Sequence, residues 1–86
     1  MRHALDEDLD RIEPLLAEIR KLPGLKERKR GSFYHGGSGF LHFHEDPAGM
    51  FADLKVDGTF MRYRVTATAE CKMFIAAAKR AVKNAV

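Results

Sequence analysis

The dipeptide Asp57-Gly58 lies between two stretches of alternating apolar and polar residues, 50–56 and 59–65. Asp-Gly in this setting is the strongest short-range signal for a β-hairpin, because a type I′ turn needs positive φ at both central residues. A two-residue turn here pairs Val56 with Thr59, and every later pair of the hairpin follows from that one. We therefore expect an antiparallel sheet built around this turn.

Four stretches with strand character follow one another, and residues typical of turns separate them. They cover residues 28–35, 38–45, 50–56 and 59–65, with breaks at residues 36–37, 46–49 and 57–58. A four-residue loop at 46–49 pairs Glu45 with Met50. This register agrees with the one set independently by Asp57-Gly58, because both place Leu41, Leu54 and Met61 on the same face.

The first hairpin has two alternatives. A two-residue turn at Gly36-Gly37 places Phe33 beside Phe40, whereas a three-residue loop that includes Ser38 places Phe33 beside Leu41. We favour the second alternative, because Phe33 then joins the apolar face.

Helices are predicted at both ends of the chain. Apolar residues from Leu5 to Ile19 recur at intervals of three and four, which is typical of one face of a helix, and Pro23-Gly24 ends it. Pro14 implies either that this helix begins near Asp10 or that it kinks. A second helix begins at Thr66 as its N-cap, with Glu70 in the first turn. The expected fold is a single α+β domain over residues 1–86, in which both helices cover one face of a four-stranded antiparallel meander.

Alternation divides the predicted sheet into two faces. The apolar face, turned toward the helices, carries Leu41, Phe43, Ala52, Leu54, Met61 and Tyr63. The other face, called the open face below, carries Lys55 and eight candidate binding residues: Phe40, His42, His44, Phe51, Asp53, Phe60, Arg62 and Arg64. A slip of one residue would bury Asp53 and Arg62 at a severe desolvation cost, so the pattern specifies the register.

The histidines of the open face suggest two kinds of chemistry. His42 and His44 point the same way from one strand, and Asp53 lies opposite His42, so His42, His44 and Asp53 are candidate ligands of zinc or a similar ion. His35 is the alternative third ligand. A histidine oriented by a carboxylate is also a usable general base, so a small histidine-dependent or metal-dependent enzyme is the alternative function. His3, near the start of the chain, carries no signal of its own.

The aromatic residues of the open face favour a binding module. Phe40, Phe51 and Phe60 with a basic rim form a patch of the kind that contacts a partner, such as a second copy of the chain, another protein or a small ligand. Aromatic residues beside Arg62 and Arg64 also resemble a platform for single-stranded nucleic acid, although the aromatic–glycine signature of an RRM is absent. The alternative is a solvated face, with an Asp53–Arg62 pair and Arg64 over the Phe51 ring.

Composition sets broader limits. The formal net charge is +3, with acidic residues concentrated in 6–18 and basic residues in 20–30, which permits contact with nucleic acid without requiring it. The single cysteine, Cys71, lies on the apolar face of the second helix, and no signal peptide or apolar membrane span is present. These features predict a soluble cytoplasmic protein without a membrane partner.

Three short motifs resemble a small uncharacterised family that is labelled "luciferase domain". They are Leu22-Pro-Gly-Leu25, Gly39-Phe-Leu-His-Phe-His44 and Phe51-Ala-Asp-Leu54, within residues 20–56. In that family a leucine–proline–glycine helix end likewise precedes a histidine-x-histidine strand and an aspartate–leucine strand. The resemblance implies that His42, His44 and Asp53 recur together, and it implies no activity.

Overall fold

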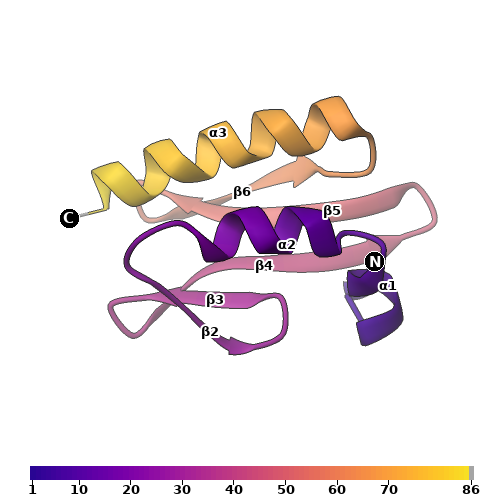
Figure 1. The fold of residues 1–86 in the computed structure, drawn as a ribbon, viewed down its shortest axis with the longest axis horizontal. Helices are drawn as coiled ribbons and strands as arrows, with labels where there is room; N and C mark the ends of the chain where they lie inside the picture. Colours follow the sequence, from indigo (N-terminus) through magenta and orange to yellow (C-terminus); the bar gives the residue numbers. More distant parts are fainter. Residues whose placement is uncertain (86) are drawn as a thin grey trace.

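A computed structural model describes residues 1–85 of the 86-residue chain, and it shows an α+β fold in two layers. Five strands form an antiparallel meander in the order β2-β3-β4-β5-β6 (Figure 1). They are β2 (Leu25–Lys29), β3 (Ser32–His35), β4 (Ser38–Asp46), β5 (Gly49–Val56) and β6 (Thr59–Arg64). A sixth strand, β1 (Arg2–His3), pairs with His44 and Glu45 of β4, past the residues of β4 that pair with β3.

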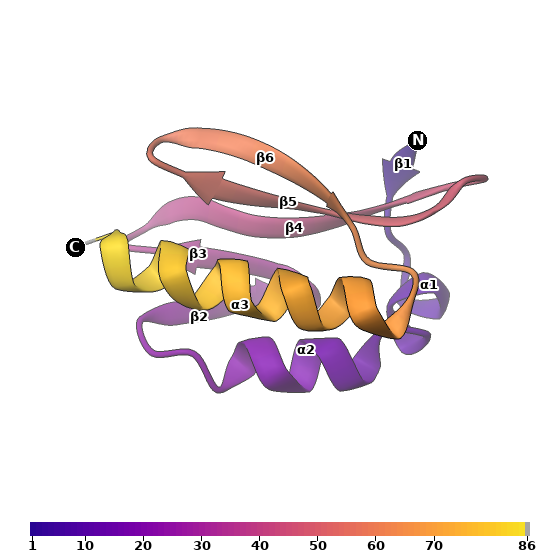
Figure 2. The ribbon, with the colours of Figure 1, turned by 90° about the horizontal axis from the view of Figure 1, so that it is seen from above.

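The helices lie on one side of this sheet. They are α1 (Asp6–Asp10), α2 (Glu13–Arg20) and α3 (Thr68–Asn84), and α2 and α3 run beneath the same face in Figure 2. Pro14 lies in the first turn of α2, where its missing N–H leaves no helical hydrogen bond unmade. The single N-terminal helix that the apolar spacing predicted is thus divided into α1 and α2, and α2 begins at Glu13 rather than near Asp10.

The start of α3 differs from the prediction. Ala67, not Thr66, occupies the N-cap position, and the Oγ1 of Thr66 instead accepts a hydrogen bond from the backbone N–H of Met50 at 2.9 Å. Glu70 satisfies the helix end, because its Oε1 accepts from the N–H groups of Ala67 at 2.8 Å and Thr66 at 3.0 Å. Glu70 thus supplies the N3 half of a capping box, in which a carboxylate inside the helix binds the backbone N–H of the N-cap residue.

The register predicted for the central strands is confirmed. Leu41 of β4 pairs with Leu54 of β5, which in turn pairs with Met61 of β6. In the same way His42 pairs with Asp53, and Asp53 pairs with Arg62. The connection from β4 to β5 is tighter than the predicted four-residue loop, because Asp46 and Gly49 also pair. Pairing Glu45 with Met50 is compatible with either loop, so the register was right although the loop was too long.

The predicted first strand, 28–35, is wrong, because the structure divides this region into two strands. β2 and β3 form a hairpin that turns at Arg30-Gly31, where Gly31 has φ +79°. The sheet therefore has one more strand in its meander than the sequence predicted. A positive φ is readily adopted by glycine, so Gly31 is the residue that permits the turn.

The hairpin between β3 and β4 combines the two alternatives. His35 pairs with Ser38 across a two-residue turn, yet Phe33 pairs with Leu41, because a β-bulge lies between these pairs. The bulge inserts Phe40 as an extra residue and changes the direction of its side chain. Phe40 is only 3% exposed and belongs to the core, so its assignment to the open face is corrected.

One residue assigned to the apolar face is not covered. Tyr63 of β6 contacts Phe74 of α3 with ring centroids 5.4 Å apart, but Met61, two residues earlier on this edge strand, is 48% exposed. The helix layer therefore ends before Met61. The largest fully buried side chains of the core are Phe33, Phe74, Leu16, Ile19, Leu41, Leu54 and Val65.

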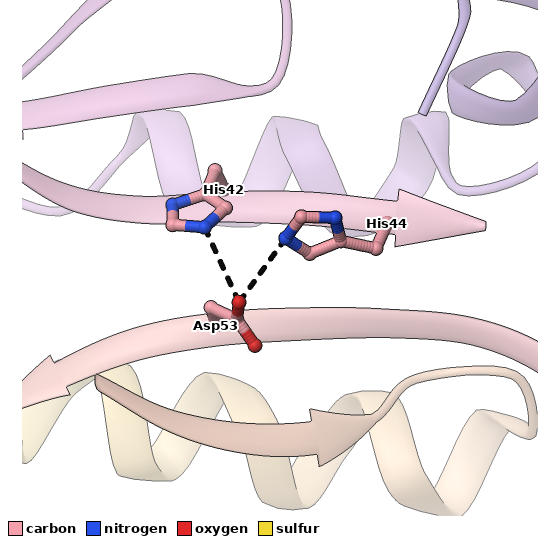
Figure 3. A group of neighbouring side chains, drawn as sticks. All are labelled: His42, His44 and Asp53. Atoms are coloured by element: carbon pink, nitrogen blue, oxygen red, sulfur yellow. Dashed lines mark ion pairs between the residues drawn. The ribbon is translucent and has the colours of Figure 1, made fainter. Parts of the chain in front are cut away.

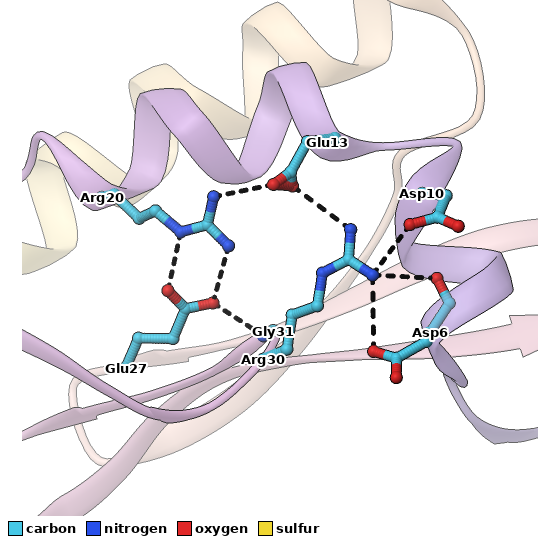
Figure 4. A network of polar contacts seen from close by, with 7 residues as sticks. All are labelled: Asp6, Asp10, Glu13, Arg20, Glu27, Arg30 and Gly31. Atoms are coloured by element: carbon cyan, nitrogen blue, oxygen red, sulfur yellow. Dashed lines mark hydrogen bonds and ion pairs between the residues drawn. The ribbon is translucent and has the colours of Figure 1, made fainter.

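Two arginines of the basic stretch, Arg20 and Arg30, form ion pairs with carboxylates of the N-terminal region. Arg20 binds Glu27 at 2.7 Å and Glu13 at 2.9 Å, while Arg30 binds Asp10 at 2.8 Å and also approaches Glu13 (Figure 4). These contacts raise the pKa of Arg20 above its ordinary value, chiefly through its hydrogen bonds to Glu27. The two arginines are therefore engaged within the fold. None of the helices over residues 1–85 combines the length and hydropathy needed to cross a lipid bilayer.

Candidate metal centre on the open sheet face

His42 and His44 converge on one carboxylate oxygen. They lie two positions apart on β4, so their side chains share the open face, and Asp53 meets them from β5 (Figure 3). Nε2 of His42 lies 3.2 Å from Oδ2 of Asp53, and Nε2 of His44 lies 3.1 Å from the same oxygen. The ligand atoms of the three residues all lie within 4.8 Å of one another.

Burial distinguishes this group from a surface ion pair. The side chains of His44 and Asp53 are 13% and 11% exposed, and that of His42 is 29% exposed. Nε2 of His44 is buried and makes no hydrogen bond, and its one short polar contact is the 3.1 Å ion-pair distance to Oδ2 of Asp53. A buried polar atom without a partner is costly, and such atoms are uncommon in folded proteins.

Arg62 and Phe60 form the surroundings of these residues. Arg62 donates to Asp53 through Nε to Oδ1 at 2.8 Å and through Nη2 to Oδ2 at 3.0 Å. The Phe60 ring meets the His42 ring edge to face, with centroids 5.1 Å apart. Both neighbours come from β6, so this strand supplies a charged and an apolar contact to the group.

These neighbours shift two pKa values. The Arg62 guanidinium, through its hydrogen bonds, holds the pKa of Asp53 below its ordinary value. Burial lowers the pKa of His42, although the nearby Asp53 carboxylate opposes this effect. At neutral pH the group therefore presents an ionised carboxylate beside a neutral His42 imidazole.

A third imidazole, for which the sequence gives no signal, lies beside the group. His3 of β1 pairs with His44, and their ring centroids lie 4.8 Å apart. The His3 ring is also 6.2 Å from that of His42. Residues 1–4 carry no strand pattern that would have predicted this pairing. His35, the predicted alternative ligand, packs against Phe40 instead, with ring centroids 5.7 Å apart.

The remaining predicted residues are less concentrated. Phe51 and Arg64 pair across β5 and β6 as expected, but the Arg64 guanidinium binds Glu70 at 3.0 Å and the carbonyl of Ala48 at 3.2 Å rather than the Phe51 ring. Lys55 lies 5.4 Å from the Phe60 ring. Five of the predicted binding residues thus lie together: His42, His44, Asp53, Phe60 and Arg62. Phe51 and Arg64 lie beside them on the open face. Phe40 is not part of this face, because it is buried in the core.

Space beside the group is small. A cavity of about 210 Å³ touches both His3 and His42, and another of about 190 Å³ shares these two residues. A larger cavity of about 420 Å³ lies away from the group, between Phe40, Lys55 and α3. Sites for organic ligands measure roughly 300 Å³ or more. Both small cavities are below this size, and neither is lined by His44 or Asp53, so the three candidate ligands meet on the open sheet face rather than inside a cavity.

No protein-family model, no curated protein and no solved structure matches this chain. The resemblance to the "luciferase domain" family stays a prediction from short motifs. What this surface does must therefore be argued from its geometry.

Proposed function

We propose that this protein is a binding module whose open face takes up a divalent first-row transition ion through His42, His44 and Asp53. The observation that carries the proposal is the convergence of Nε2 of His42 and the buried Nε2 of His44 on one carboxylate oxygen, at 3.2 and 3.1 Å, with no hydrogen bond made by the His44 nitrogen. Coordination of an ion by its lone pair would give this nitrogen a directed partner. Imidazole nitrogen with carboxylate oxygen is a donor set that suits zinc and its neighbours.

The spacing supports the same conclusion. Two ligands bound to zinc at about 2.0–2.1 Å in a tetrahedral site lie roughly 3.3 Å apart. The two nitrogen–oxygen separations, 3.2 and 3.1 Å, are close to that value. All ligand atoms lie within 4.8 Å of one another, so side-chain movements of about 1 Å bring them to a common ion.

Arg62 opposes the ion and also positions its carboxylate ligand. Its Nη2 shares Oδ2 with the two histidines, so this hydrogen bond competes with an ion for the lone pairs of that oxygen. The Nε bond goes to Oδ1 and can be retained, which leaves Arg62 as an outer-sphere partner that orients Asp53. The Arg62 side chain is 49% exposed and has room to move.

A metal-dependent enzyme is the alternative proposal for the same residues. Three protein ligands with one open position are the arrangement of catalytic zinc sites, where a bound water becomes the nucleophile. The cavities that touch His42 are not lined by His44 or Asp53, so they do not hold an organic substrate beside all three ligands. We therefore rank ion binding first.

Zinc titration of untagged protein, followed by calorimetry, tests the proposal. We expect one equivalent to bind tightly, and His42→Ala to abolish this binding. His35→Ala is the matched control, because it removes an imidazole outside the group and should bind zinc like the wild type. Absence of zinc uptake by the wild-type protein, or equal affinities for the His42→Ala and His35→Ala variants, contradicts the proposal.

Self-association is a second proposed function, supported by β6. This strand is an edge of the meander, and it carries Phe60 and Met61, which are 44% and 48% exposed. An exposed edge with large apolar side chains is a surface for pairing with a second copy of the chain. Light scattering over a concentration series tests this proposal: the wild type should grow in mass and Phe60→Ala should not. A monomer at all concentrations contradicts it.

Single-stranded nucleic acid is the least supported partner. The burial of Phe40 leaves Phe51 and Phe60 as stacking residues, and the internal ion pairs engage Arg20 and Arg30. Such binding would weaken steeply with salt, and an affinity independent of salt contradicts it.

We also propose a cytoplasmic location, for which the unpaired Cys71 is the support.

A further inference from the structure

Strand β1 carries His3 to the rim of the proposed metal site. Directly opposed residues of an antiparallel pair share a face, so the pairing of His3 with His44 places its ring on the open face. The three ring centroids are separated by 4.8 Å for His3–His44, 5.0 Å for His42–His44 and 6.2 Å for His3–His42. They form a triangle, and two of its three rings, those of His42 and His44, contact Asp53.

The size of this triangle fits a shared ion. With a zinc–nitrogen distance of about 2.0–2.1 Å, the centre of a bound imidazole ring lies roughly 3.2 Å from zinc, and two such rings on a tetrahedral ion lie roughly 5 Å apart. Two of the observed separations match that spacing and the third exceeds it by about 1 Å. Because His3 is exposed, its ring can turn without displacing core residues.

Few contacts hold β1 in place. Two residue pairs join it to β4, and the N–H of Ala4 donates to the carbonyl of Phe43 at 3.2 Å. Arg2 binds the buried Asp8 at 2.9 Å and lies 3.9 Å from Glu45. A segment with few buried apolar contacts opens at low free-energy cost, so one additional bond to an ion would change its stability substantially.

We propose that His3 is a fourth ligand of the ion, and that the ion therefore ties β1 to β4 and β5. This inference rests on the proposed function, because it requires that His42, His44 and Asp53 bind the ion. Four protein ligands complete a tetrahedral shell, which is the arrangement of structural zinc sites. Binding of the ion and docking of β1 then stabilise each other by the same factor.

Zinc and cobalt titrations of untagged wild type, His3→Ala and Arg2→Gln test this inference. We expect His3→Ala to weaken zinc affinity by about 10- to 100-fold and to reduce the strong visible absorption of four-coordinate Co²⁺. Arg2→Gln keeps the ligand but loosens β1, so it should weaken zinc affinity by a smaller factor. Zinc should also slow amide exchange at Arg2 to Ala4 in the wild type and not in His3→Ala.

The outcomes separate the two proposals. If the wild type binds no zinc, the proposed function itself fails. If the wild type binds zinc and His3→Ala matches it in affinity, cobalt spectrum and amide exchange, the metal site stands and the role of His3 is overturned. His3 is exposed, so we expect His3→Ala to fold like the wild type, and a far-ultraviolet spectrum of the variant provides the check.

Discussion

Arg62 binds Asp53 from the neighbouring strand through two parallel hydrogen bonds, 2.8 Å from Nε to Oδ1 and 3.0 Å from Nη2 to Oδ2. The second bond ends on the same oxygen that His42 and His44 approach. Asp53 is only 7% exposed, so its charge needs a partner. Arg62 supplies that partner when no ion is bound, and the two cations compete for Oδ2.

This competition predicts the behaviour of Arg62→Ala. Without an ion, the variant leaves a buried carboxylate uncompensated, and we expect its melting temperature to fall by roughly 5 °C. Zinc should restore much of this loss, because it replaces the missing cation beside Asp53. Thermal melts of wild type and Arg62→Ala, each with zinc and with chelator, make the measurement. A larger stabilisation by zinc in the wild type than in the variant contradicts the prediction.

The bulge at Phe40 predicts contrasting effects of two phenylalanine substitutions. Phe40→Ala removes a core side chain and should lower the free energy of unfolding by about 3–5 kcal/mol. Phe60→Ala alters an exposed side chain on the open face and should change it by less than about 1 kcal/mol. Urea unfolding measures both values. Equal losses would place the two rings in equivalent environments and contradict the burial of Phe40.

Glu70 predicts a pH-dependent contribution to stability. The hydrogen bond that it accepts from the Ala67 N–H holds its pKa below the usual 4.5, and a hydrogen bond from Arg64 acts in the same direction. A lowered folded-state pKa means that the stabilisation is present above about pH 4.5 and is lost as the pH falls through the folded-state pKa. Glu70→Gln should therefore unfold at a lower urea concentration than the wild type at pH 7, and the difference should shrink as the pH falls through the folded-state pKa of Glu70. Gln retains an acceptor for the helix end, so the comparison isolates the charge.

Gly49 predicts a local cost of adding a single methyl group. It has φ +132°, and a Cβ at this position would overlap the Oγ1 of Thr66, which binds the N–H of Met50. We expect Gly49→Ala to lose about 1–3 kcal/mol of unfolding free energy. Gly39→Ala is the control, because nothing lies within 4 Å of its added Cβ, and it should change stability by less than about 0.5 kcal/mol. Similar losses in both variants contradict this account.

The central sheet was predictable because local and alternating signals agreed. Asp57-Gly58 specified the turn between β5 and β6, and side-chain alternation placed Asp53 beside His42 and Arg62. A shift of one residue would have buried charges, so few registers competed. The β2–β3 hairpin carried a weaker signal, since Gly31 is a lone glycine within a basic stretch, and it was missed.

The sequence by itself determined the α+β class, the pairing of β4, β5 and β6, and the meeting of His42 with Asp53, because each follows from periodicity and turns only a few residues away. Only the tertiary structure decided that a bulge buries Phe40, that the helix layer leaves Met61 uncovered, and that β1 brings His3 to His44. The physical reason is distance along the chain: His3 and His44 meet through backbone pairing of segments that carry no local signal for each other. Packing against other elements likewise selected the burial of Phe40 and the exposure of Met61, and no local pattern encodes that packing.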